Sequence, residues 1–259
     1  MMENILYAIE NNVGYITLNR PDKSNALLTE VKKEFTDLLR QVKNDPEVRS
    51  LVITGAGKNF CAGGDLTTMG NKQTSVQGRE RMRFSYEWFK ELYYLEKPVI
   101  AAVNGAASGA GFGLALACDM IIAADNAKFI SGAIRLGIVI DMASLYMLPR
   151  RIGIGKAKQI VYTGRPVLAS EAEQIGLVDK ITTPENLLQE VKIAAEEFAQ
   201  GPTYAIGLTK NIINRCFETD VLSILDFESA YQSIAFLTED HQIALKAFFE
   251  KEKPNFVGR

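Results

Sequence analysis

Histidine is almost absent from this chain, and cysteine is scarce. The single histidine is His241, and the three cysteines are Cys61, Cys118 and Cys216. One histidine excludes a metal site built from several histidines, and it leaves no conventional Ser-His-Asp triad unless His241 itself serves. The cysteines are scattered singly, which is typical of free thiols in a reducing compartment. We therefore expect a cytoplasmic protein without a metal ion.

The sequence also lacks a basic excess, a long apolar run and a nucleotide-binding fingerprint. Its formal net charge is −2, whereas nucleic-acid binders normally show a basic bias. Its apolar runs are far too short to cross a bilayer. Its first residues have neither the basic start nor the apolar core of a signal peptide. We expect neither a nucleic acid nor a membrane as partner.

Apolar residues are plentiful, at 47% of the 259 residues, which is enough for a substantial core. Strand and helix patterns alternate over the first two-thirds, beginning with a predicted hairpin at residues 5–9 and 13–18. Helical patterns dominate afterwards, with one long helical stretch predicted over residues 222–251. This shift in composition divides the chain into predicted regions of residues 1–200 and 201–259.

The most distinctive stretch is rich in glycine and spans residues 104–113. An apolar run at residues 99–103 precedes it, so we predict a strand, a turn and a helix. Such a turn exposes backbone N–H groups, which favour a phosphate or an oxyanion that develops during reaction. The small residues can equally serve only to pack a helix closely on a strand. The spacing fits neither of the two common nucleotide-binding motifs.

A second glycine-rich loop precedes this stretch, and further short motifs follow it. In chain order the motifs are Phe60-Cys61-Ala62-Gly63-Gly64-Asp65-Leu66, Lys97-Pro98-Val99-Ile100-Ala101-Ala102-Val103-Asn104-Gly105, Ala117-Cys118-Asp119-Met120, Ala127-Lys128-Phe129, Leu168-Ala169-Ser170-Glu171-Ala172 and Ile175-Gly176-Leu177-Val178-Asp179. In this order they resemble the crotonase family, also called the enoyl-CoA hydratase/isomerase family. The resemblance extends from the N-terminal hairpin to Phe256.

The resemblance implies an α/β fold, a crotonase-type spiral of ββα units with a C-terminal helical region that forms trimers. Two such trimers often stack, so a homotrimer or a dimer of trimers is expected. The implied substrate is an acyl-CoA thioester. No separate cofactor is expected, because CoA is part of the substrate.

The family's oxyanion hole consists of two backbone N–H groups, which the resemblance assigns here to Gly64 and Ala110. The family's usual glycine at the second position is alanine in this chain, so the N–H remains while a methyl group crowds the site. Two fixed donors on a thioester oxygen would stabilise the enolate formed when a neighbouring carbon loses a proton. Removing one such donor typically costs about 3–4 kcal/mol.

The resemblance also implies which residues contact CoA. Because the protein is slightly acidic, local basic groups should attract the CoA phosphates. The implied CoA and substrate contacts are Arg20, Lys23, Ala26, Ala62, Asp65, Leu66, Lys251 and Lys253. The last two lie in a tail that reaches the CoA of a neighbouring subunit in the family. Each of these lysines can equally be a solvated surface charge.

Two expected glutamates are missing. Hydratases of the family use two glutamates to activate water, and these positions correspond here to Gly113 and Ala133, so simple syn hydration is disfavoured. Family members that shift double bonds place an aspartate where this chain has Asp141. Its apolar neighbours would raise the pKa of Asp141 and make it a better base. A competing interpretation is a helix N-cap, which would lower that pKa.

These features favour an enoyl-CoA isomerase that moves a double bond by proton transfer through Asp141 alone. Alternatives are an enoyl-CoA hydratase, a dehalogenase-like hydrolase and a non-catalytic acyl-CoA binding or scaffold protein. The dehalogenase resemblance is weaker, because its activating histidine falls at Tyr86 and its pocket tryptophan at Ala133. Asp141 and the intact oxyanion loop argue against a non-catalytic protein.

Overall fold

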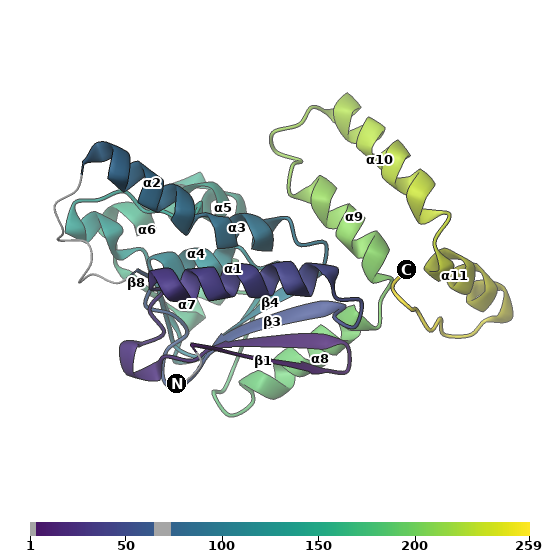
Figure 1. Cartoon of the computed structure of the whole chain (residues 1–259), viewed down its shortest axis with the longest axis horizontal. Coiled ribbons are helices and arrows are strands. Elements are labelled where there is room, and N and C mark those ends of the chain that lie inside the picture. The colour runs from purple at the N-terminus through teal and green to yellow at the C-terminus, as the bar shows by residue number, and fades with distance from the viewer. Residues whose placement is uncertain (1–3, 65–73) are drawn as a thin grey trace.

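A twisted six-stranded sheet lies at the centre of the computed structural model, which describes residues 4–64 and 74–259 (Figure 1). In spatial order its strands are β1 (Ile5–Glu10), β2 (Val13–Leu18), β3 (Ser50–Gly55), β4 (Val99–Val103), β6 (Met120–Ala124) and β9 (Lys180–Thr182). β1 and β2 pair antiparallel, which confirms the predicted hairpin, and every later pairing in this sheet is parallel.

A smaller sheet lies next to it. It consists of β5 (Ala106–Ser108), β7 (Lys128–Ile130) and β8 (Pro166–Leu168). Two isolated bridges, Cys61 to Ala107 and Leu27 to Gly64, join two further loops to its edge. The smaller sheet therefore gathers the segments that follow the parallel strands of the larger one.

Helices cover both sheets. The α-helices of the body are α1 (Thr29–Asn44), α2 (Ser75–Ser85), α3 (Glu87–Tyr93), α4 (Ala110–Leu116), α5 (Ser144–Ile152), α6 (Ile154–Thr163), α7 (Ala169–Gln174) and α8 (Leu187–Ala199), with 3-10 helices η1 (Pro21–Lys23) and η3 (Gly132–Leu136). The chain repeatedly runs from a strand of the larger sheet to the smaller sheet and then to a helix, as in β4–β5–α4 and β6–β7–η3. This repeat confirms the predicted spiral of ββα units.

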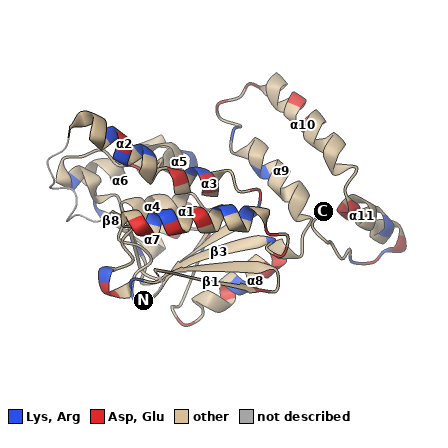
Figure 2. Cartoon of the chain, in the orientation of Figure 1, with Lys and Arg blue, Asp and Glu red and all other residues tan. Residues whose placement is uncertain are grey.

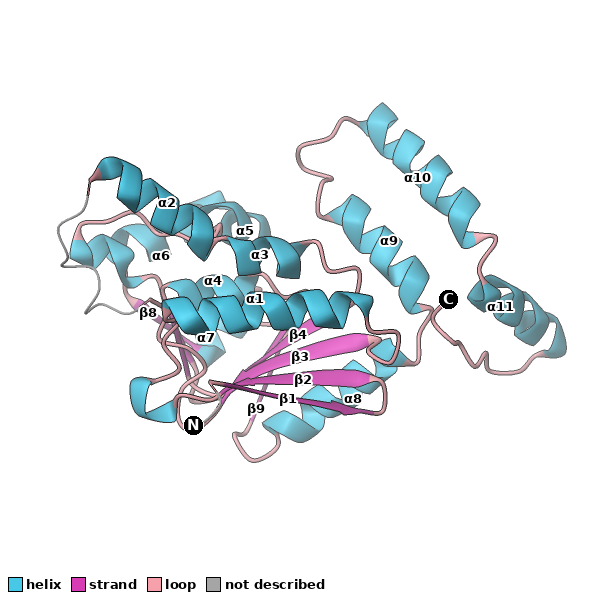
Figure 3. Ribbon diagram, in the orientation of Figure 1, coloured by secondary structure: helices cyan, strands magenta, loops and turns pink. Residues whose placement is uncertain are grey.

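Strand sequences explain why helices pack on both faces of the larger sheet. Along β3, Leu51 and Ile53 contribute to the core beneath α1, while Val52 contributes to the core beneath α8. Side chains of a strand alternate between faces, and a parallel sheet covered on both sides needs apolar residues throughout. Fully burying each such side chain stabilises the fold by about 1.5–3 kcal/mol. Figure 3 shows α1 and α8 on opposite sides of the sheet.

The last helices are α9 (Thr203–Ile213), α10 (Val221–Ala235) and α11 (Glu239–Glu250). α9 packs against the body, where Lys210 pairs with Asp119, whereas α10 and α11 extend away from the sheets (Figure 1). The prediction of one long helical stretch over residues 222–251 is wrong, because two separate helices, α10 and α11, occupy this range. Thr238 begins the second one by accepting a hydrogen bond from the His241 N–H. The division at residue 200 stays a prediction. No helix in the described ranges is long and apolar enough to span a membrane.

Candidate active site

The glycine-rich loop that comes first in the chain, residues 59–64 and called here the first glycine-rich loop, runs beside β5. The Cys61 N–H donates to the Ala106 carbonyl at 3.1 Å, and the Ser108 N–H donates to the Cys61 carbonyl at 2.9 Å. Gly111, in the first turn of α4, approaches the loop so closely that a Cβ there would lie 2.1 Å from the Cys61 carbonyl oxygen. Only glycine permits this approach, so it brings the two glycine-rich segments into contact.

The predicted oxyanion donors, the N–H groups of Gly64 and Ala110, belong to these touching segments. A Cβ at Gly63 would lie 2.9 Å from the Ala110 nitrogen. The bridge between Gly64 and Leu27 uses a hydrogen bond from the Leu27 N–H to the Gly63 carbonyl and not the Gly64 N–H. Ala110 is the first residue of α4, where an N–H has no helical acceptor. Within the described chain, neither N–H donates to a backbone carbonyl.

Asp141 lies between η3 and α5 and is half-buried. Burial raises the pKa of its carboxyl above the ordinary value of 3.8, while a hydrogen bond from its own N–H and the charge of Lys32 oppose this shift. Desolvation disfavours the charged form of a carboxyl group. Asp141 is therefore a stronger proton acceptor than an exposed aspartate, as its apolar neighbours in sequence predict.

The competing interpretation of Asp141 as a helix N-cap is wrong. Helix α5 begins at Ser144, and its N-cap position is held by Ala143, which makes no side-chain capping bond. Met142 and Ala143 have φ angles of 51° and 50°, in the left-handed region that favours glycine. The sharp turn that these two residues form separates Asp141 from the helix.

Comparison with known proteins identifies the family. The family described as enoyl-CoA hydratase/isomerase matches residues 8–259. The chain belongs to the enoyl-CoA hydratase/isomerase family. It is 39% identical over 258 residues to a crotonyl-CoA hydratase of Syntrophomonas wolfei, with 99% of each chain covered. It is 37% identical over 263 residues to a 1,2-epoxyphenylacetyl-CoA isomerase of Escherichia coli, with 100% of each chain covered.

A solved structure of an enoyl-CoA hydratase/isomerase from Cupriavidus metallidurans has a TM-score of 0.94 and 33% identity to this chain. The structural match covers 99% of this chain and 97% of the Cupriavidus metallidurans chain. This likeness confirms the predicted crotonase-type fold. Hydratase names are common among the relatives, so the names do not favour isomerase over hydratase.

The position where family hydratases were expected to carry a first glutamate has no room for a side chain here. A Cβ at Gly113 would lie 2.5 Å from the Met142 Cβ and 3.1 Å from the Ser144 hydroxyl oxygen. The expected second position, Ala133 in η3, is half-buried and uncharged. The left-handed turn after Asp141 thus occupies the space into which a residue at 113 would project.

Sequence reasoning missed Lys32. It lies on α1, where Val31 and Phe35 are buried, and its ammonium donates to the Ser85 hydroxyl at 2.9 Å. Burial lowers the pKa of Lys32, and the charge of Asp141 opposes this shift. A signal existed in the sequence. Lys32 lies four residues after Leu28 and three before Phe35, on the apolar face of a predicted helix.

Tyr86 also belongs to this neighbourhood. It follows Ser85 at the end of α2, and burial raises the pKa of its phenol, with a further contribution from the charge of Asp141. In the sequence, Tyr86 stands where the dehalogenase has its activating histidine. The structure brings it into electrostatic range of Asp141, from an element far away in sequence.

Four predicted CoA contacts gather at the loop of residues 20–26. Arg20 donates from Nη1 to the Ala26 carbonyl at 3.3 Å. The Ala62 N–H donates to the carbonyl of Ser24 at 2.9 Å, which places Ala62 beside the same loop. Lys23 is exposed. The loop therefore presents cations next to the first glycine-rich segment.

A buried amide connects these two segments. Asn25 is 2% exposed. Its Nδ2 donates to the Ala56 carbonyl at 3.0 Å and to the Asn59 carbonyl at 2.8 Å, and its Oδ1 accepts from the Arg20 N–H at 2.9 Å. One side chain thus holds the predicted CoA loop against the loop that leads to Gly64.

The remaining predicted contacts are not gathered at this site. Asp65 and Leu66 lie outside the described residues. Lys251 and Lys253 are exposed and follow α11, on the side of the chain away from η1 (Figure 1). Their contact with the CoA of a neighbouring subunit stays a prediction.

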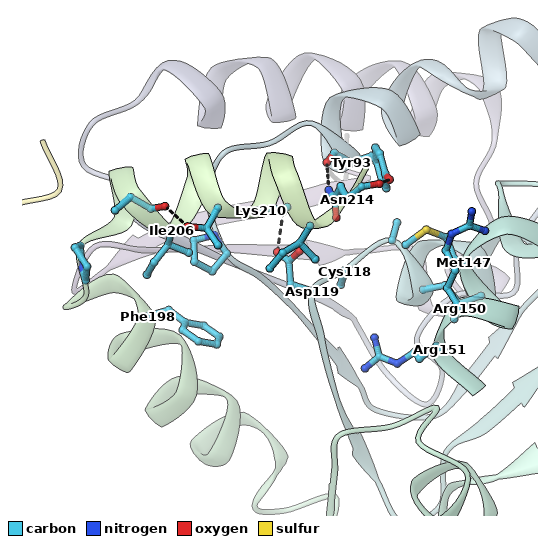
Figure 4. Close-up of a pocket in the computed structure, with 17 residues that line it drawn as sticks. Tyr93, Cys118, Asp119, Met147, Arg150, Arg151, Phe198, Ile206, Lys210 and Asn214 are labelled. Atoms are coloured by element: carbon cyan, nitrogen blue, oxygen red, sulfur yellow. Dashed lines mark hydrogen bonds and ion pairs between the residues drawn. The ribbon is translucent and has the colours of Figure 1, made fainter. Parts of the chain in front are cut away.

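A separate cavity of about 720 Å³ lies between α9 and the body, beside α5 (Figure 4). Several of its polar groups pair with one another. The Lys210 ammonium lies 2.7 Å from the Asp119 carboxylate, and the Asn214 side chain donates to the Tyr93 carbonyl at 3.1 Å. Among its described lining residues are neither Asp141 nor the two glycine-rich segments. We therefore assign the chemistry to the loops and not to this cavity.

Proposed function

We propose that this protein is an enoyl-CoA isomerase in which Asp141 moves a proton between two carbons of the acyl group. The observation that carries the proposal is the half-buried Asp141 with a raised pKa, next to a Gly113 that has no space for a glutamate. A base works best when its pKa approaches the working pH. Burial shifts Asp141 in that direction.

The proposed reaction needs one proton-transfer group. The thioester oxygen of a 3-enoyl-CoA accepts hydrogen bonds from the N–H groups of Gly64 and Ala110. The Asp141 carboxylate removes a proton from C2, and the electrons move into a dienolate whose charge the two donors stabilise. Protonated Asp141 then returns the proton to C4, which yields the conjugated 2-enoyl-CoA and restores the carboxylate.

The same proposal includes CoA binding and assembly. Arg20, Lys23, Ala26 and Ala62 would contact the CoA portion, and Lys251 and Lys253 would reach the CoA of a neighbour in a trimer or a dimer of trimers. Helix α10 supports an assembly, because it has no buried residue and exposes apolar side chains such as Leu222 and Leu225. Figure 2 shows few charges on it.

A hydratase is the second candidate, because relatives such as the crotonyl-CoA hydratase of Syntrophomonas wolfei carry that name. Hydration adds a water oxygen at C3 and a proton at C2, for which the family uses two carboxylates. The two reactions are distinguished by supplying 3-enoyl-CoA and 2-enoyl-CoA separately. Conjugated thioester absorbance rises in isomerisation and falls in hydration.

The test is Asp141→Asn, which keeps the size of the side chain and removes its basicity. We expect isomerisation to fall by about 100- to 10,000-fold, with acyl-CoA affinity nearly unchanged. Asp125→Asn, at an exposed position, is the matched control and should retain full activity. An Asp141→Asn enzyme that keeps most of its isomerase rate would refute this role. Efficient hydration of 2-enoyl-CoA by the wild type would favour the second candidate.

A further inference from the structure

An inward-facing ammonium is unusual on an amphipathic helix, because burying a charge is costly unless the group is paired. Lys32 is half-buried, whereas its neighbour Lys33 on α1 is exposed. The lowered pKa of Lys32, caused chiefly by burial, reflects the cost of keeping this charge away from water. Because keeping the Lys32 ammonium half-buried costs free energy, we expect this charge to serve a function.

The local contacts of Lys32 leave part of its bonding capacity unused. An ammonium has three N–H donors. One of them bonds the hydroxyl of Ser85, a side chain that is 3% exposed at the end of α2. Within residues 4–64 and 74–259, Lys32 forms no ion pair with a carboxylate and no second side-chain hydrogen bond. Ser85 therefore fixes the ammonium in position without neutralising it.

The charged groups around Lys32 place it within the site. It is in electrostatic range of Cys61, which lies on the first glycine-rich loop, and of Asp141 on the opposite segment. Arg81 on α2 adds a second cation. Burial raises the pKa of Cys61 to about 12, so its thiol stays neutral. The ionised groups that act on Lys32 are thus one cation, Arg81, and one carboxylate, Asp141.

We propose that Lys32, positioned by Ser85, binds a carboxylate at the far end of the substrate's acyl group. In this proposal the thioester carbonyl binds at Gly64 and Ala110 and its acyl chain extends towards Asp141. Lys32 is in electrostatic range of Asp141 and of Cys61 on the loop that leads to Gly64. The substrates would then be CoA thioesters of acyl groups that carry a second, free carboxylate. This inference rests on the proposed function and deepens it by naming the substrate class.

The alternative role for Lys32 is to adjust Asp141 alone. Its positive charge favours the ionised form of that carboxyl, so Lys32→Met would then shift the acid limb of the pH–rate profile upwards. That role predicts no preference among acyl groups. Acyl-group preference is therefore the measurement that separates substrate recognition from adjustment of the base.

The test uses saturated esters, which cannot isomerise, so it remains valid if Asp141 is not the base. Calorimetry compares glutaryl-CoA with pentanoyl-CoA, which have equal carbon number and differ in the terminal carboxylate. We expect glutaryl-CoA to bind wild-type protein about 10- to 100-fold more tightly, as for a charge-assisted hydrogen bond. Lys32→Met should abolish this preference, and Lys33→Met should retain it.

Two results would overturn the inference. One is equal affinity of wild-type protein for both esters. The other is a preference for glutaryl-CoA that survives in Lys32→Met while its melting curve shows a folded protein. Ser85→Ala, which frees the ammonium from its hydroxyl partner, should weaken the preference without abolishing it. Failure of isomerisation with normal discrimination between the esters would count against the proposed function and not against Lys32.

Discussion

The glycine-rich loops and the segment that carries Asp141 both turn the chain sharply, yet they use different residues. In the loops, the left-handed positions are Gly63, with φ of 89°, and Gly109, with φ of 51°. After Asp141 the corresponding positions are Met142 and Ala143. A left-handed non-glycine residue costs about 1–2 kcal/mol. The proposed oxyanion donors thus lie beside glycines that adopt their φ angles without strain, whereas the proposed base precedes two strained residues.

This difference implies different compensation. The loops need no side chain to hold their conformation, because glycine adopts it freely. Met142 is 2% exposed, and its Cβ occupies the space next to Gly113. Burial of this side chain offsets the strain of its backbone. The missing glutamate and the strained turn are consequently two aspects of one packing arrangement.

The largest effect is expected at the loop contact. Gly111→Ala would place a methyl carbon 2.1 Å from the Cys61 carbonyl oxygen, and rigid backbone on both sides leaves little room to relax. We expect destabilisation of about 3 kcal/mol and loss of activity. Gly155→Ala, in α6 with nothing within 4 Å of the added Cβ, is the matched control and should stabilise by about 0.5–1 kcal/mol. Equal melting temperatures of the two variants would contradict the close contact.

The next effect tests the packing of the strained turn against α4. Gly113→Glu should destabilise by about 2 kcal/mol and should not restore hydration, because its Cβ meets Met142. In a Met142→Gly background the same substitution should cost about 1 kcal/mol less, since the obstructing side chain is gone. Denaturant unfolding of the four proteins measures this coupling. Strict additivity would show that the two positions do not compete for space.

A pH dependence of stability follows from the raised pKa of Asp141. Below its ordinary pKa of 3.8 the carboxyl is neutral in both folded and unfolded chains, so burial carries no penalty. As the pH rises through the raised pKa, the folded protein acquires a half-buried charge and its unfolding free energy falls.

Asp141→Asn removes this penalty, so its melting temperature should exceed that of wild type at pH 7 by a few degrees. For a protein of this size, each kcal/mol of unfolding free energy shifts the melting temperature by about 2–4 °C. The difference should vanish near pH 3.5. Asp125→Asn should show no such pattern. A lower melting temperature of Asp141→Asn at pH 7 would contradict the burial of the charge.

The smallest effect is expected at Ala143, which has a φ of 50°. Ala143→Gly should relieve backbone strain and stabilise the protein by about 0.5–1 kcal/mol. The gain is partly offset by the greater freedom of glycine in the unfolded chain. The measurement is the melting temperature of Ala143→Gly. The control is an alanine-to-glycine substitution at an exposed position within a helix, which should lower the melting temperature. Destabilisation at both positions would argue against strain at this turn.

Local patterns in the sequence predicted much of the fold. Alternating apolar residues predicted the hairpin, and the resemblance supplied the spiral. The break between α10 and α11 was missed, because apolar residues continue through positions 236 and 237 and only Thr238 marks a new helix start. A capping threonine within a helical pattern is a weak signal, since threonine also occurs inside helices.

The site was predicted less completely. The two glycine-rich segments were identified by residue type and Asp141 by the family resemblance, and the structure shows the two segments in contact. Whether Asp141 caps a helix depends on the φ angles of Met142 and Ala143, which no residue pattern indicates. Lys32 and Tyr86 approach Asp141 from helices far away in sequence. Such contacts arise from packing between elements, which sequence spacing does not encode.

The buried amide of Asn25 has a consequence for the use of binding energy. Two of its hydrogen bonds join the loop with Arg20 and Lys23 to the loop that leads to Gly64, and the third bonds the Arg20 N–H within the first of these loops. In the proposed binding mode, a CoA group anchored on the loop with Arg20 and Lys23 would meet N–H donors whose ordering entropy was already lost during folding. In that mode, contacts with the distant nucleotide end of the substrate would fix the thioester in the reactive position, although that end takes no part in the reaction.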